Sequence, residues 1–79
     1  MQPIKDLLNK IKWDKRENPE EYTLFYFDRI LNKLISIPYN KIKRLEGLFM
    51  IIDNVEEANI PLHRVKKIIR NNVVVWERK

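Results

Sequence analysis

A motif of nine residues is repeated in similar form in this chain, and no other sequence feature constrains the fold as much. Residues 37–45 and 60–68 align at an offset of 23 residues, and both copies begin with Ile-Pro. Each copy carries cations at matching positions and leads into an apolar run. Proline fixes one backbone dihedral and cannot donate to a sheet ladder, so it marks a turn or the end of a strand. The repeat therefore predicts two proline-fixed turns, each followed by strand sequence.

This repeat has two interpretations. It indicates either an internal duplication of a turn-plus-hairpin unit, over residues 36–52 and 59–76, or two unrelated turns with the same local requirement. Two copies are too few for a solenoid. With 79 residues in all, the chain is expected to be a single domain, residues 1–79.

Outside the repeat, the pattern predicts one helix and short strands. Apolar side chains at helical spacing predict a helix over residues 3–13, with Pro3 at its first position. The clearest strand is residues 22–27, which places large side chains on both faces and should be central. Further short strands are expected at 34–37, 43–46, 48–53, 65–70 and 73–77.

The connections between these strands carry recognisable turn residues. Gly47 is the only glycine and is expected where the backbone needs a positive φ. The pair Asn71-Asn72 suits a two-residue hairpin, because asparagine tolerates left-handed geometry. Residues 54–59 are expected to be a loop. The predicted class is α+β, an N-terminal helix packed on a curled, mostly antiparallel sheet or a small open barrel of five or six short strands.

Composition narrows the classes of function. Sixteen cations against eleven anions give a net charge of +5, which favours an anionic partner. The absence of cysteine excludes thiol chemistry, and a single glycine excludes a glycine-rich phosphate loop. One histidine and scattered carboxylates give no metal-ligand spacing, so neither a metal nor a cofactor is expected. No apolar run is long enough for a bilayer and no signal peptide is visible, so we expect a cytoplasmic protein with no membrane partner.

The cations gather around the two Ile-Pro turns. Those of the first turn are Lys41, Lys43 and Arg44, and those of the second are Arg64, Lys66, Lys67 and Arg70. No acidic residue interrupts the second set, which makes it the stronger candidate for contact with a nucleic-acid backbone. The alternative is an ordinary solvated face of a sheet. The acidic residues lie elsewhere in the sequence, which indicates one selectively positive face.

His63 and Arg64 are the residues best suited to hold a phosphate. Arginine offers a planar fork to two oxygens, and histidine adds a donor that is charged below its pKa. His63 could instead support the turn, or act as a general acid or base, although no second acid–base partner accompanies it. Arg29 follows the central strand and could reach the same anion, oriented by Asp28. The alternative for Arg29 is a surface ion pair with Asp28.

Three aromatic residues are candidates for stacking on an RNA base: Tyr39, Trp76 and Trp13. For both tryptophans, packing in the core is the competing expectation. Tyr39 stands beside Pro38 in a turn and is expected to be the most exposed tyrosine.

The chain also resembles a known family. The residues that carry the resemblance are 60–78 (Ile-Pro-Leu-His-Arg through Val-Trp-Glu-Arg), 7–14 (Leu-Leu-Asn-Lys-Ile-Lys-Trp-Asp) and 26–29 (Tyr-Phe-Asp-Arg). This looks like a small archaeal family of uncharacterised proteins, whose domain is also fused into eukaryotic proteins. That domain has been proposed to recognise RNA ends bearing a cyclic phosphate. The chain departs from expectation at Asn71-Asn72, where Asn-Gly or Asp-Gly would be usual; the difference affects the cost of the turn and not its chemistry.

The resemblance and the charge together favour a non-catalytic RNA-binding domain with a role in RNA processing or repair. The resemblance implies an RNA terminus with a 2′,3′-cyclic phosphate as ligand. His63, Arg64 and Arg29 would hold the phosphate, and the lysines of both turns would hold the backbone. Two alternatives stay open: a structural adaptor that binds protein, and an RNA-end phosphoesterase that uses His63. The sequence does not indicate an oligomeric state.

Overall fold

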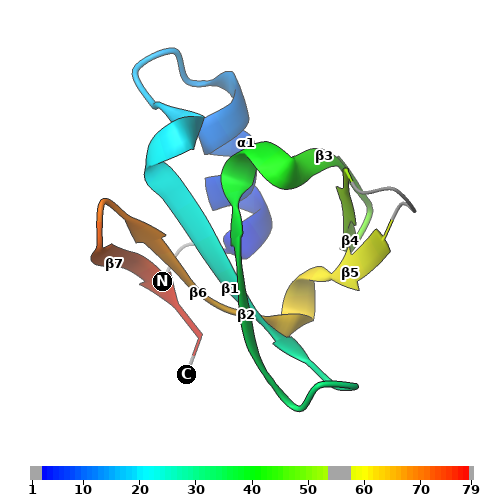
Figure 1. Ribbon diagram of the computed structural model, residues 1–79. Helices are drawn as coiled ribbons and strands as arrows, with labels where there is room; N and C mark the ends of the chain where they lie inside the picture. The colour runs from blue at the N-terminus through cyan, green and yellow to red at the C-terminus, as the bar shows by residue number, and fades with distance from the viewer. Residues whose placement is uncertain (1–2, 54–57, 79) are drawn as a thin grey trace.

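The structure is a computed structural model that describes residues 3–53 and 58–78. Within these residues the chain forms one α-helix, three short 3-10 helices and seven β-strands (Figure 1). In chain order they are α1 (Ile4–Trp13), η1 (Pro19–Glu21), β1 (Tyr22–Asp28), β2 (Lys33–Pro38), η2 (Tyr39–Lys41), β3 (Ile42–Glu46), β4 (Phe49–Ile52), β5 (Ala58–Pro61), η3 (Leu62–Arg64), β6 (Val65–Arg70) and β7 (Val73–Glu77).

The strands form two open antiparallel sheets. One sheet has four strands in the order β2-β1-β6-β7, and the other has three in the order β3-β4-β5. Strand β1 lies between β2 and β6, as its large side chains on both faces predicted. The α+β class with a helix on an antiparallel, unclosed sheet is therefore confirmed.

The sequence missed one strand. Residues 54–59 were expected to be a loop, yet β5 begins at Ala58. Residues 54–57 lie outside the described part of the chain. The short β5 segment contains asparagine and proline, which have low strand propensity, so its sequence gave little signal. It is a strand because it pairs with β4, where Ile60 lies opposite Met50.

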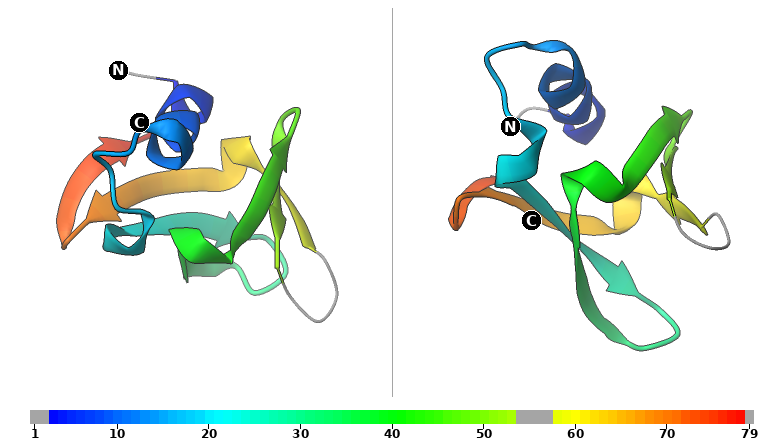
Figure 2. Two further views of the ribbon diagram at one scale, coloured as in Figure 1. Left: turned by 90° about the horizontal axis from the view of Figure 1, so that it is seen from above. Right: turned by 45° about the horizontal axis from the view of Figure 1, so that its top comes forward.

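The predicted helix covers one face of the four-stranded sheet (Figure 2). Leu7, Leu8 and Ile11 form its buried stripe, and Leu8 and Ile11 are almost completely inaccessible. This stripe packs in one core cluster with Leu24 of β1 and Ile68 of β6. A helix of this length is marginal by itself in water, so docking on the sheet is what stabilises it.

Each Ile-Pro phrase is a corner at which the chain passes from one sheet to the other. The first corner leads from β2 through η2 to β3, and the second leads from β5 through η3 to β6. In both corners the residue after the proline is buried, Tyr39 in the first and Leu62 in the second. The two segments thus have the same structural role. In each, a strand of one sheet ends, the chain turns around a buried side chain, and a strand of the other sheet begins. That they arose by duplication stays a prediction.

The turn predictions are confirmed by the backbone angles. Gly47 has φ of 58°, and Asn71 and Asn72 have φ of 50° and 69°. Two successive positive values are the geometry of the tight hairpin that joins β6 to β7. A third asparagine, Asn32 with φ of 55°, serves the hairpin between β1 and β2.

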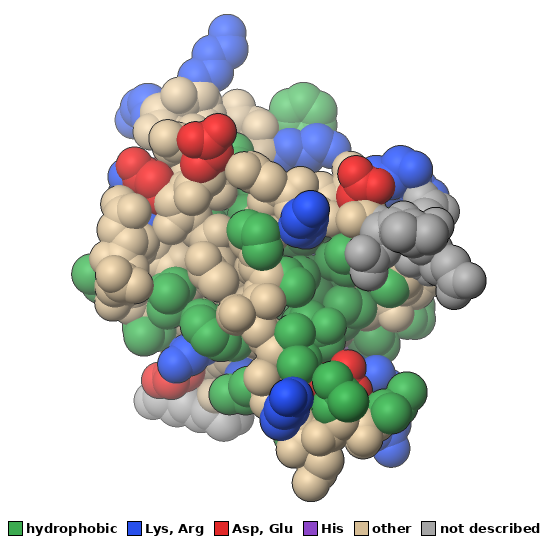
Figure 3. All heavy atoms as spheres, in the orientation of Figure 1, with side chains coloured by type: hydrophobic (Ala, Val, Ile, Leu, Met, Phe, Trp, Pro, Cys, Tyr) green, Lys and Arg blue, Asp and Glu red, His purple; other side chains and the backbone are tan. Residues whose placement is uncertain are grey.

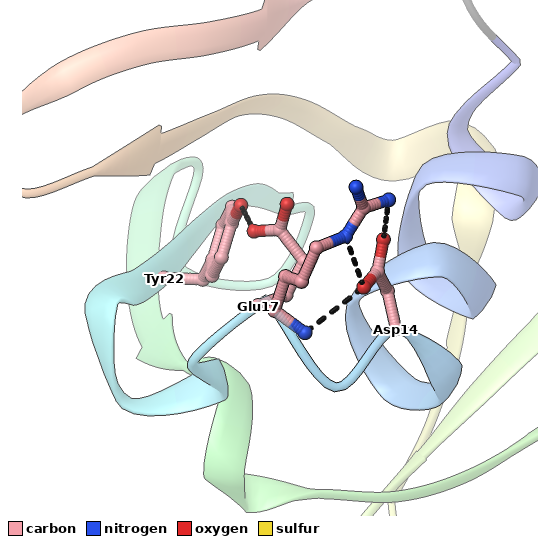
Figure 4. A network of polar contacts seen from close by, with 4 residues as sticks. Asp14, Glu17 and Tyr22 are labelled. Carbon is pink, nitrogen blue, oxygen red and sulfur yellow. Dashed lines mark hydrogen bonds and ion pairs between the residues drawn. The ribbon is translucent and has the colours of Figure 1, made fainter.

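A local polar network fixes the connection from α1 to β1 (Figure 4). The Asp14 carboxylate accepts hydrogen bonds from the backbone N–H and the guanidinium of Arg16. The Glu17 carboxylate accepts a hydrogen bond from the hydroxyl of Tyr22, the first residue of β1. Asn18 then caps η1 by accepting from the backbone N–H of Glu20 at 3.0 Å. These contacts hold the start of the central strand in place.

Candidate nucleic-acid interface

The two Ile-Pro corners lie at opposite ends of β1. Pro38, at the first corner, is the partner of Thr23, whereas Val65, at the second, is the partner of Tyr26. Three residues of strand separate these pairs, or roughly 10 Å. The corner η2 contacts η1 near the start of β1, and η3 contacts β1 near its end. The two groups of cations therefore adjoin different points along β1.

The second corner gathers the residues best suited to hold a phosphate. His63 is exposed, and Arg64 is half-buried. Arg29 is exposed in the turn that follows β1, and β1 runs toward the end of the sheet where η3 lies. The predicted trio of His63, Arg64 and Arg29 thus comes from one end of the four-stranded sheet.

Arg64 carries an unusual donor. Its Nε is buried and has no hydrogen-bond partner among residues 3–53 and 58–78. A buried donor without a partner costs about 1 to 3 kcal/mol. A ligand oxygen that reaches this guanidinium after a small side-chain movement would recover that energy.

The sequence reasoning missed the residue that holds this corner together. Arg78 donates from Nε to the Val65 carbonyl at 3.1 Å and from Nη2 to the Leu62 carbonyl at 3.2 Å. Its guanidinium also lies 5.0 Å from the centre of the Trp76 ring. The sequence around Arg78 does not predict this role, because both carbonyls belong to a turn that is distant in the sequence.

Asp28 does not orient the Arg29 guanidinium as expected. Its Oδ1 accepts the backbone N–H groups of Ile30 and Leu31, each at 2.9 Å. Asp28 therefore shapes the turn that carries Arg29 and leaves the Arg29 side chain exposed. Short side-chain-to-backbone bonds of this kind are the usual work of an aspartate at a turn.

The four cations from Arg64 to Arg70 are not equivalent. Lys66 is exposed at a bulge, since its neighbours Val65 and Lys67 pair with the adjacent residues Tyr26 and Phe25. The Lys67 ammonium lies 4.7 Å from the centre of the Phe25 ring.

Arg70 is paired with an acidic residue that is distant in sequence. It donates to the Glu21 carboxylate at 2.7 Å, and this contact raises the pKa of the Arg70 guanidinium. The stretch from Arg64 to Arg70 contains no acid in sequence, but the fold brings Glu21 to its end. Arg70 is accordingly less available for an RNA backbone than expected.

The cations of the first corner belong to the other sheet. Lys41 ends η2 and is exposed, and Lys43 and Arg44 lie on β3. Arg44 donates to the Glu46 carboxylate at 2.8 Å. These residues therefore lie on the elements that lead into and begin the three-stranded sheet.

Two of the three aromatic expectations need correction. Tyr39 is buried, and its hydroxyl donates to the Leu8 carbonyl at 2.9 Å, so the expectation of an exposed ring is wrong. Trp13 is 73% exposed instead of packed in the core. It is the last residue of α1 and lies outside the buried stripe. Trp76 is buried in the core cluster, as the packing alternative predicted.

The structure instead exposes a different pair of aromatic residues. Phe25 and Phe27 are half-buried and stand outside the core cluster. They alternate along β1 with Leu24 and Tyr26, which pack toward α1, so they face away from the helix. The period-two pattern of residues 22–27 already separated these two faces. What it did not indicate was that the second face stays outside the core formed by the described residues.

Figure 3 shows this second face obliquely. Hydrophobic side chains lie over the region where β7, β6 and β1 run in Figure 1, with cations among them. The histidine side chain is not visible from this direction.

Other kinds of site find little support in the described residues. No pocket is detected in residues 3–53 and 58–78. Within the same ranges, no three His, Asp or Glu side chains gather in a way that could hold a metal ion. None of the described helices has the length and apolar character required to cross a bilayer.

Comparisons with known proteins agree on one family. The family model described as "MJ1316 RNA cyclic group end recognition domain" matches residues 1–78. A UPF0248 protein of Saccharolobus islandicus is 33% identical over 78 residues, covering 95% of this chain and 98% of the relative. The UPF0248 proteins of Metallosphaera sedula and Pyrococcus horikoshii are 36% and 37% identical, and they cover 95% and 96% of this chain and 91% and 89% of their own lengths. No solved structure matches the chain.

Proposed function

Because the chain belongs to the MJ1316 RNA cyclic group end recognition domain family, we propose that it binds RNA termini bearing a 2′,3′-cyclic phosphate without converting them. The observation that carries this proposal is the Nε of Arg64, a buried donor with no hydrogen-bond partner among the described residues. Its sequence neighbour His63 and Arg29, in the turn that follows β1, are both exposed. A role in RNA processing or repair would follow from this recognition.

A terminal cyclic phosphate matches the chemistry of this corner. It is a compact anion with two non-bridging oxygens, and an arginine fork addresses two such oxygens at once. Arg78 holds the backbone of the corner through two carbonyls, so the donors would be positioned before the ligand arrives. A pre-positioned site loses less entropy on binding and can discriminate better between similar ends.

Binding without turnover is the simpler proposal for His63. Hydrolysis of a cyclic phosphate needs an acid and a base placed on opposite sides of the phosphorus. His63 is the chain's only histidine, and within the described residues no carboxylate hydrogen-bonds to it. His63 then serves as a hydrogen-bond donor to the phosphate.

The test is a titration of one short RNA made with three 3′ ends: 2′,3′-cyclic phosphate, linear phosphate and hydroxyl. The wild-type protein should prefer the cyclic end, and Arg64→Gln should reduce that preference by about tenfold or more, because a charged hydrogen bond is lost. Arg16→Gln is the matched control, since Arg16 is highly exposed and lies on the α1–β1 connection. Equal affinity of the wild type for all three ends would contradict end recognition.

The same RNA distinguishes the enzymatic alternative. Prolonged incubation of the cyclic-phosphate RNA should leave it unchanged, as judged by mass spectrometry. Appearance of a linear phosphate that disappears with His63→Ala would make the protein a phosphoesterase.

A protein-binding adaptor is the second candidate, and one observation favours it. Val73, Val74 and Val75 are exposed on β7, which is an edge strand of the four-stranded sheet. Exposed apolar side chains on a free edge can receive another strand. This candidate predicts no salt-dependent RNA affinity, whereas phosphate binding predicts a clear loss of affinity with salt.

A further inference from the structure

The outer face of the four-stranded sheet has properties that end recognition alone does not explain. We propose that this face is a stacking platform for the last two bases of single-stranded RNA, with Phe27 under the terminal base and Phe25 under the preceding one. The proposal rests on the proposed function and extends it from the phosphate to the bases.

The first argument is the arrangement of the two rings. Phe25 and Phe27 lie two residues apart on the same side of a central strand, so their Cα atoms are roughly 6.6 Å apart. That interval lets two unstacked neighbouring bases lie on separate rings. Single-stranded RNA is commonly recognised in this way, by aromatic side chains on the open face of a four-stranded sheet.

The second argument is that no helix or strand among residues 3–53 and 58–78 packs on this face as part of the core. Both α1 and the three-stranded sheet contribute to the core cluster on the opposite side, while Phe25, Phe27 and Ile69 are not part of it. These three side chains are half-buried, so part of each stays accessible to a ligand in the centre of the sheet.

The chemistry around the rings favours a nucleic acid over an apolar partner. The pairing places Lys67 and Ser36 on either side of Phe25. Lys67 supplies a cation and Ser36, which is exposed, supplies a hydroxyl that can both donate and accept. Exposed Lys66 and Arg29 lie at the margins of the same strands. A protein-docking face would instead be depleted of charge at its centre.

The Lys67 ammonium at present lies over the Phe25 ring, at 4.7 Å from its centre. A base stacked on an aromatic ring contributes more than an exposed cation–π contact does. An incoming base would displace the flexible lysine, and the released ammonium could pair with the phosphate that follows the base. Lys67 thus covers the Phe25 ring in the absence of RNA and contributes a positive charge when RNA is bound.

The position of the corner gives the bound strand a direction. η3, with His63 and Arg64, contacts β1, and Val65, which follows η3, pairs with Tyr26, the neighbour of Phe27. A terminal phosphate at Arg64 therefore places the terminal base next to Phe27, and the chain of nucleotides then continues along β1 toward Phe25.

The experiment compares three matched Phe→Leu variants in RNA binding. Phe25→Leu and Phe27→Leu remove a ring from the face but keep its apolar character, whereas Phe49→Leu removes a 44% exposed ring from the other sheet. Each variant is first checked for wild-type circular dichroism and melting temperature. The probe is a short RNA with 2-aminopurine at the last or the preceding position, made with cyclic-phosphate and hydroxyl ends, and a matched RNA that is abasic at both positions.

We expect Phe25→Leu and Phe27→Leu each to weaken binding by roughly tenfold for both kinds of end, and Phe49→Leu to leave it unchanged. The loss should disappear with the abasic RNA, and 2-aminopurine quenching should fall at the last position for Phe27→Leu and at the preceding one for Phe25→Leu. If end preference is retained while both variants bind like wild type, the platform is overturned and end recognition stands. If the variants lose affinity but no end is preferred, the platform stands and end recognition fails. No RNA binding by the wild type would overturn both.

Discussion

Arg78 Nη2 donates to the Leu62 carbonyl at 3.2 Å, and this contact ties the end of the C-terminal strand to the corner that carries His63 and Arg64. Together with the bond from Arg78 Nε to Val65, it satisfies two carbonyls around η3. A residue with no direct ligand role thereby sets the geometry of the candidate phosphate site.

Replacing Arg78 with alanine should lower the free energy of unfolding by about 1 to 3 kcal/mol, since two charge-assisted hydrogen bonds are lost. It should also weaken binding of cyclic-phosphate RNA by more than the loss of one positive charge explains. Urea denaturation and an RNA titration measure the two effects. Lys15→Ala, with the same change of charge on an exposed side chain, is the control. If the Arg78 variant were as stable as the wild type, the two hydrogen bonds of Arg78 would not stabilise the corner.

Tyr39→Phe tests the buried anchor of the first corner. The variant keeps the ring but removes the hydroxyl that donates to the Leu8 carbonyl at 2.9 Å. We expect a loss of about 0.5 to 1.5 kcal/mol in the free energy of unfolding, with RNA affinity unchanged. If the variant lost RNA affinity but kept wild-type stability, Tyr39 would have to contact the RNA.

Stability at alkaline pH should depend on Tyr22. Burial raises the pKa of Tyr22 from 10.0 to about 12, with a smaller contribution from its hydrogen bond to Glu17. Because the folded state raises this pKa, the stabilisation is fully present below pH 10 and is lost as the pH rises toward about 12. The free energy of unfolding should fall by roughly 2 to 3 kcal/mol across this window.

Urea denaturation between pH 9 and 12 measures this loss, and Tyr22→Phe is the comparison that separates Tyr22 from the lysines. The variant should show a shallower decline than the wild type over the same range. Parallel curves for the two proteins would mean that the Tyr22 phenol titrates normally.

The salt dependence of RNA binding should separate Lys66 from Arg70. Lys66 is exposed, and its removal in Lys66→Gln should reduce the slope of log K against log salt by about 0.7. Arg70 is already paired with Glu21 at 2.7 Å, so Arg70→Gln should leave the slope nearly unchanged. Its effect on stability should stay below about 1 kcal/mol, as for other surface ion pairs. Equal changes in slope for both variants would refute this ranking.

What the sequence determined by itself is local. The spacing of Leu7, Leu8 and Ile11 predicts the helix, and the residues of 22–27 predict the central strand. Gly47 and the Asn71-Asn72 pair mark positive φ because few other residues tolerate it at low cost. The Ile-Pro phrase predicts a turn in both places, since proline ends a strand wherever it stands. The family match likewise rests on the sequence alone.

The tertiary structure decided which of these residues meet. It put the two Ile-Pro corners at opposite ends of β1, buried Tyr39 against Leu8, and brought Glu21 to Arg70. It also left the face of Phe25 and Phe27 open, although the sequence suggested a strand covered on both sides. All of these outcomes depend on contacts between residues far apart in the chain, such as Tyr39 and Leu8, which lie 31 positions apart. Local propensity carries no information about such pairs, because the pairing of strands and the packing of the helix establish them only in the folded chain.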